Sequence, residues 1–88
     1  MRIRVTRSGG LAGLSRQAEL DTSGRPDAAE WERLARAALA GSRAGPAPGV
    51  PDGFRYTVTV DDRTVEFADP HLSEAQNELV DRVLREGA

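Results

Sequence analysis

Apolar residues in this chain recur at every second position in four short stretches and at every third or fourth position in two longer ones. A period of two is typical of half-buried strands, whereas spacing by threes and fours is typical of one face of a helix. The alternating stretches cover residues 2–7, 14–21, 54–60 and 64–68, and the helical stretches cover residues 28–39 and 72–84. The predicted order is strand, strand, helix, strand, strand, helix.

This order predicts an α+β fold, a four-stranded antiparallel sheet with two helices packed on one face (ββαββα). Trp31, Phe54 and Phe67 are expected to lie between the two layers. With 88 residues, the chain is expected to form a single domain, residues 1–88. The other face of the sheet is expected to be open and polar, with both charges present: Arg2, Arg4, Thr6, Gln17, Glu19, Arg55, Thr57, Thr59 and Glu66.

Local signals predict where the helices begin. Asp27, followed three residues later by Glu30, resembles a capping box at the start of the first helix. Asp69 and Pro70 fit the N-cap and first residue of the second helix. Residues 41–53 hold four glycines and three prolines, which predicts a long Gly/Pro-rich internal loop that is either functional or mobile.

The composition excludes several kinds of chemistry. The chain has no cysteine, so disulfides, thiolate nucleophiles and cysteine-containing zinc sites are excluded. His71 is the only histidine and is interpreted as a solvated residue, and the adjacent Asp61 and Asp62 are interpreted as a turn between two strands. We therefore predict a protein that is not an enzyme, with no metal site and no cofactor.

Charge and hydropathy argue against nucleic-acid and membrane partners. The net charge is -2, and the 12 basic residues, all arginine, are spread along the chain. The expected open face of the sheet lacks the aromatic residues with which four-stranded sheets stack RNA bases. No apolar run resembles a signal peptide or a membrane span, so a cytoplasmic location is expected.

The glycine-rich segment between the first two predicted strands contains one unexpected residue. Gly9, Gly10 and Gly13 are unlike a phosphate-binding loop, because a strand follows them where such loops lead into a helix. Leu11 stands among these glycines at a hairpin tip, where polar residues are usual. It either presents an apolar anchor to a partner or folds back over an open end of the core. Trp31, in contrast, shares the apolar stripe of its helix and is predicted to be a core residue.

Three segments together resemble the emfourin family, small cytoplasmic bacterial proteins that inhibit protealysin-like zinc metalloproteases of the thermolysin family. They are MRIRVTRSGGLAGLSRQAELD at residues 1–21, PDGFRYTVTVDD at residues 51–62 and AQNELVDRVLRE at residues 75–86. The most specific part is the run from Arg7 to Gly13. The resemblance covers nearly the whole chain except the proline-rich loop.

The resemblance implies an inhibitor that occupies the active-site cleft of a thermolysin-like metalloprotease without being turned over. The expected contact is the first hairpin loop, with Leu11 in an apolar pocket of the enzyme. A second candidate is the proline-rich loop, and the free protein is expected to be monomeric. The competing hypothesis is a non-catalytic interaction module that binds through the open sheet face or a sheet edge. The candidate contact residues are Arg7, Ser8, Gly9, Gly10, Leu11 and Gly13 in the first loop, and Pro48, Val50 and Pro51 in the second.

Overall fold

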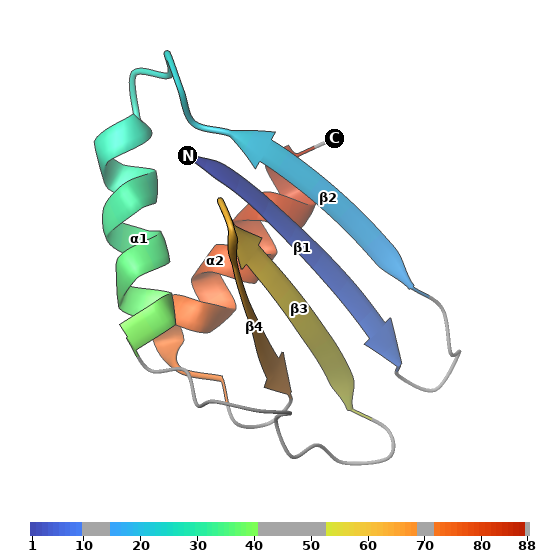
Figure 1. The fold of residues 1–88 in the computed structure, drawn as a ribbon. Coiled ribbons are helices and arrows are strands. Elements are labelled where there is room, and N and C mark those ends of the chain that lie inside the picture. The colour runs from blue at the N-terminus through green and yellow to red at the C-terminus, as the bar shows by residue number, and fades with distance from the viewer. Residues whose placement is uncertain (10–14, 41–52, 69–71, 88) are drawn as a thin grey trace.

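A computed structural model describes residues 1–9, 15–40, 53–68 and 72–87 of the chain. The predicted α+β architecture and element order are confirmed (Figure 1). The elements are β1 (Arg2–Gly9), β2 (Arg16–Asp21), α1 (Ala28–Ala40), β3 (Phe54–Val60), β4 (Arg63–Ala68) and α2 (Glu74–Glu86).

The four strands form one antiparallel sheet in the order β2-β1-β3-β4. The sequence predicted the two hairpins, and the structure shows that they join through their first strands. β1 pairs with β3 from Ile3 opposite Val60 to Gly9 opposite Phe54. The two central strands are therefore β1 and β3, and the edges are β2 and β4.

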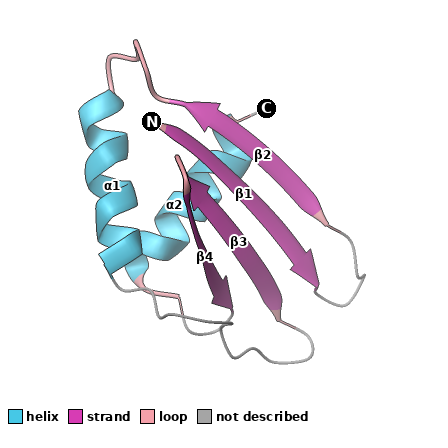
Figure 2. Cartoon of the chain, in the orientation of Figure 1, coloured by secondary structure: helices cyan, strands magenta, loops and turns pink. Residues whose placement is uncertain are grey.

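Both helices cover the same face of the sheet, as Figure 2 shows. Most of the described strand positions predicted to point inward are buried beneath them, because a strand sends successive side chains to opposite faces, and Val65 is partly buried. Phe54, at the first position of β3, packs against the core as predicted, but it is only partly buried and so lies at the margin of the two layers. The core consists of Ile3, Val5, Ala18, Leu20, Tyr56, Val58, Val60 and Phe67 from the sheet, and Trp31, Leu34, Ala35, Ala38, Leu79, Val80, Val83 and Leu84 from the helices.

Trp31 is fully buried at the start of α1, which confirms its predicted place in the core. Its indole Nε1 donates a hydrogen bond to the carboxylate of Asp27, at 3.0 Å, and the guanidinium of Arg82 lies 4.4 Å from the ring centroid. The capping box predicted for Asp27 does not form. Its carboxylate instead accepts hydrogen bonds from Trp31 and Arg25, so these donors take the place of the backbone N–H of Glu30.

Helix α2 begins at Glu74, so the prediction of a start at Asp69 and Pro70 is wrong; these two residues lie outside the described ranges. The N-cap is Ser73, which forms a capping box with Gln76. The Ser73 hydroxyl accepts from the backbone N–H of Gln76 at 3.2 Å, and the Gln76 side chain accepts from the backbone N–H of Ser73 at 2.9 Å. This reciprocal pair satisfies two backbone donors at once, which fixes the helix start there.

Gln76 also links the two helices. Its side chain is buried, and its Nε2 donates to the carbonyl of Ala38 near the end of α1, at 3.1 Å. Neither described helix is long and apolar enough to cross a membrane.

Candidate functional site

One end of the sheet carries the attachment points of both candidate contact segments. β1 ends at Gly9, β3 begins at Phe54 opposite it, and β4 ends at Ala68, opposite Arg55. We call this the loop end, defined by these four residues (Figure 1). Six predicted contact residues lie outside the described ranges, and their role stays a prediction: Gly10, Leu11, Gly13, Pro48, Val50 and Pro51.

The two candidate segments are attached directly beside each other, at Gly9 and Gly53. Gly9 has a φ of +92°, a region that side-chain-bearing residues rarely adopt. A Cβ added to Gly9 would lie 2.9 Å from the carbonyl oxygen of Gly53. Both the backbone conformation and the close approach therefore require glycine at this position.

The remaining described residues of the first segment, Arg7 and Ser8, lie on opposite faces of the sheet. Ser8 is exposed. Arg7 is partly buried and points to the face that carries the helices, as Ile3 and Val5 do at the preceding alternate positions of β1. The guanidinium of Arg7 lies 4.5 Å from the ring centroid of Phe54. A contiguous run in the sequence is therefore divided between two surfaces.

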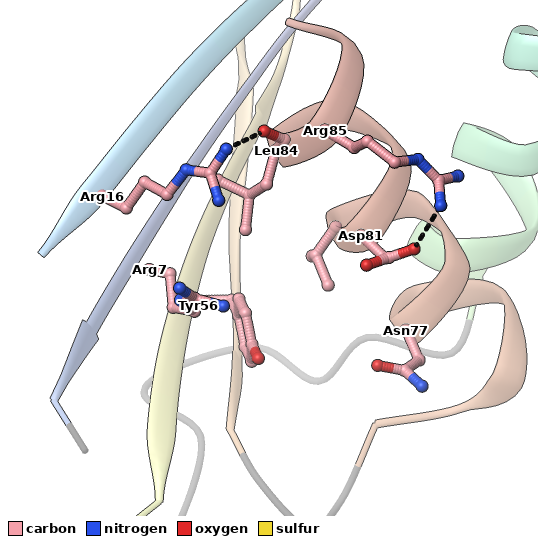
Figure 3. Close-up of a pocket in the computed structure, with 8 residues that line it drawn as sticks. Arg7, Arg16, Tyr56, Asn77, Asp81, Leu84 and Arg85 are labelled. Carbon is pink, nitrogen blue, oxygen red and sulfur yellow. Dashed lines mark hydrogen bonds and ion pairs between the residues drawn. The ribbon is translucent and has the colours of Figure 1, made fainter. Parts of the chain in front are cut away.

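A groove lies next to the loop end, between the sheet and α2 (Figure 3). Its volume is about 370 Å³, large enough for an amino-acid side chain. It is lined by Arg7, Arg16, Tyr56, Asn77, Val80, Asp81, Leu84 and Arg85.

Sequence reasoning singled out Arg7 but missed the other polar residues of this groove, Arg16, Asn77, Asp81 and Arg85. A signal was present in β2. Arg16 has the same alternation phase as Ala18 and Leu20, so the pattern already placed a charged residue on the apolar side of the strand. Arg16 and Arg7 are directly opposite each other in the register of β1 and β2.

The positive charges of the groove are only partly neutralised. Arg85 forms an ion pair with Asp81 along α2, at 3.4 Å. Arg16 Nη2 donates to the backbone carbonyl of Leu84, in the last turn of α2. In the part of the chain that the structure describes, no carboxylate forms an ion pair with Arg7 or Arg16.

Two aspartates with lowered pKa values, Asp21 and Asp27, lie at the other end of the molecule, where β2 leads into α1. The pKa of Asp27 is lowered mainly by its hydrogen bonds with the Arg25 side chain, and further by the Trp31 indole. The pKa of Asp21 is lowered mainly by hydrogen bonds from Ser23. These bonds hold the connection between β2 and α1 together, so the shifts have a structural cause.

The paired carboxylates Asp61 and Asp62 form the turn between β3 and β4, as predicted. Asp61 has a φ of 55°, which aspartate tolerates, and its Oδ1 accepts from the backbone N–H of Arg2 at 2.9 Å. Across the described ranges, no group of three His, Cys, Asp or Glu side chains is placed to hold a metal ion. His71 lies outside those ranges.

The open face of the sheet is polar, as predicted, and some of its charges are paired. Arg4 and Glu19 form an ion pair across β1 and β2 at 2.8 Å, and Arg2 lies 3.6 Å from the same carboxylate. Thr59 and Thr64 share a hydrogen bond across β3 and β4 at 3.1 Å.

A comparison with family models matches residues 5–84 to Emfourin. The match covers β1 from Val5 onward, all of β2, α1, β3 and β4, and α2 as far as Leu84. No curated protein and no solved structure gives a significant match to the chain. The chain therefore belongs to the emfourin family, which is known for inhibitors of protealysin-like metalloproteases.

Proposed function

We propose that this protein inhibits a thermolysin-like zinc metalloprotease by inserting the segment around Leu11 into the active-site cleft. The main support for inhibition of a metalloprotease is membership of the emfourin family, which is matched over residues 5–84. The loop end of the sheet supports the location, because the candidate segment leaves the sheet there.

The segment is preceded by β1, which forms its stem and is held firmly in the sheet. β1 is a central strand, paired with β2 as far as Arg7 opposite Arg16 and with β3 as far as Gly9 opposite Phe54. A contact segment that leaves a fixed strand loses less conformational freedom on binding than one that leaves a loose terminus. The close approach of Gly9 to Gly53 adds a further restraint at the point of departure.

The side chain of Leu11 is the proposed anchor. Thermolysin-like enzymes select large apolar side chains on the primed side of the scissile bond, which suits leucine. The glycines on either side of Leu11 would let the backbone approach such a cleft closely. Binding without turnover follows if the paired stem keeps the segment away from the geometry needed for attack on its peptide bonds.

The test is to titrate a thermolysin-like protease with the purified chain and follow peptide hydrolysis. Leu11→Asp should weaken inhibition by at least about thirtyfold, equivalent to about 2 kcal/mol, the scale of a hot-spot residue. Its free energy of unfolding should change by only about 0.5 kcal/mol if the side chain is exposed. Equal losses of stability and inhibition would show that Leu11 belongs to the core.

Two control variants test which part of the surface contacts the protease. Val50→Asp introduces the same charge in the proline-rich candidate segment, and Thr57→Arg places a long charged side chain on the open sheet face, where Thr57 is exposed. We expect both to inhibit more strongly than Leu11→Asp. Loss of inhibition by Thr57→Arg with full inhibition by Leu11→Asp would favour the open face as the binding surface.

A further inference from the structure

We propose that the groove between β1, β2 and α2 is a carboxylate-binding site, and that in the complex it receives an aspartate or glutamate side chain of the protease. The identity of the partner rests on the proposed function above. The carboxylate site itself rests on the groove.

The first observation is the pairing of Arg7 with Arg16. These residues are directly opposite each other across β1 and β2, on the face that carries the helices. Like charges at directly opposed positions destabilise a sheet. Neither guanidinium has an ion-pair partner among the described residues, so no carboxylate there neutralises the two charges. A bound anion between the two would remove their repulsion.

Each guanidinium is held in place while most of its donors stay available. Arg7 Cζ lies over the ring of Phe54, 4.5 Å from its centroid, and this cation–π contact helps to hold the guanidinium in place. Arg16 uses Nη2 for the carbonyl of Leu84, and a guanidinium carries five N–H groups in a planar fork. Paired donors of this fork match the two oxygens of a carboxylate.

The opposite wall of the groove adds a neutral amide and a neutralised acid. Figure 3 shows Arg7, Arg16 and Tyr56 on the sheet side of the groove and Asn77, Asp81 and Arg85 on the α2 side. The ion pair with Arg85 reduces the repulsion that Asp81 would exert on an incoming carboxylate. The groove thus has excess positive charge in a chain whose net charge is -2.

The position of the groove points to a side chain of the protease as its occupant. Arg7 is two residues before Gly9, where the proposed contact segment leaves the sheet. In the proposed complex, a partner bound to that segment covers the adjacent surface, so an acidic side chain at the rim of its cleft would meet both arginines there.

The first experiment needs no protease. Propionate is titrated into the free protein at constant chloride concentration, with the neutral propionamide as the matched probe, while NMR follows the arginine Nε–H signals. The signals of Arg7 and Arg16 should shift saturably with propionate and not with propionamide, and Arg7→Gln should abolish the shift at Arg16. Arg63, exposed at the opposite end of the sheet, is the internal control. Shifts that do not saturate, or that are equal at Arg63, would overturn the carboxylate site.

The second experiment measures inhibition as a function of salt. Arg7→Gln and Arg16→Gln should each raise the inhibition constant about tenfold and flatten its salt dependence, as loss of a contact to a partner's carboxylate requires. Arg63→Gln changes the net charge equally and should behave as the wild type. Because Arg16 also bonds to Leu84, unfolding curves verify that each variant is folded, and Arg7→Gln tests the site without removing that bond.

The two experiments separate the proposals. A wild-type chain that fails to inhibit would refute the proposed function, and the propionate titration would still decide whether the groove binds carboxylates. If the Arg7→Gln variant and the Arg16→Gln variant each inhibit as strongly as the wild type, the contact between the groove and the protease is refuted.

Discussion

Replacing Gly9 by alanine tests whether the close packing at the loop end is required. Gly9 has a φ of +92°, and a Cβ there would lie 2.9 Å from the Gly53 carbonyl oxygen. Gly24 provides a matched control, since it has a φ of +79° but no atom within 4 Å of the added Cβ. The two substitutions share the conformational cost and differ in the steric one.

The magnitudes follow from these two causes. A side chain in the left-handed region costs about 1 to 2 kcal/mol, which is the expected loss for Gly24→Ala. An extra methyl group in a closely packed site costs about 1 to 3 kcal/mol more, so Gly9→Ala should lose about 2 to 5 kcal/mol. That is a large part of the total stability of a small domain, which is about 0.05 to 0.15 kcal/mol per residue.

Urea unfolding followed by tryptophan fluorescence measures both variants, because Trp31 is the only tryptophan and is fully buried. Under conditions where both variants are folded, the proposed function predicts that Gly9→Ala inhibits a metalloprotease less well than Gly24→Ala, since the stem of the proposed contact segment must shift. Equal losses of stability in the two variants would show that the approach to Gly53 is not a constraint. No loss in either would refute the argument from backbone conformation as well.

Two further predictions concern the junction of α1 with the rest of the fold. Trp31→Ala should lower the free energy of unfolding by about 3 to 5 kcal/mol, because it empties a fully buried site. Denaturation followed by circular dichroism measures this loss. A midpoint equal to that of the wild type would contradict the prediction. The lowered pKa of Asp27 means that its contribution to stability is complete above the pKa of an unfolded aspartate, about 4, and is lost as the pH falls through the lowered value. Unfolding measured from about pH 6 to about pH 2 should therefore show a weaker loss of stability on acidification in Asp27→Asn than in the wild type, and identical pH profiles would refute the role assigned to the Arg25 and Trp31 hydrogen bonds.

The predicted element order rested on periodicity, a local property that the backbone imposes directly. Alternation placed Ile3, Val5 and Val58 on the buried face, and the helical spacing placed Trp31 and Leu79 in the core. These assignments hold because the direction of a side chain depends on its position within its own strand or helix.

The start of α2 was local too, but two signals competed for it. Asp69 and Pro70 are an ordinary helix start, yet the reciprocal bonds of Ser73 and Gln76 define the start in the structure. Gln76 also donates to Ala38 of α1, a contact that depends on how the two helices pack. The capping box expected at Asp27 failed for a similar reason, because Arg25 and the buried indole of Trp31 bind its carboxylate.

The amino-acid sequence by itself determined the α+β class, the faces of the strands and helices, and the glycine-rich segment that makes Gly9 a candidate. Only the tertiary structure decided that β1 pairs with β3, that Gly9 meets Gly53, and that Arg7 faces Arg16 beside α2. The physical reason is that periodicity fixes which way a side chain points from its own strand. Which distant strand lies beside it is set by the burial of the whole apolar face of the sheet under both helices.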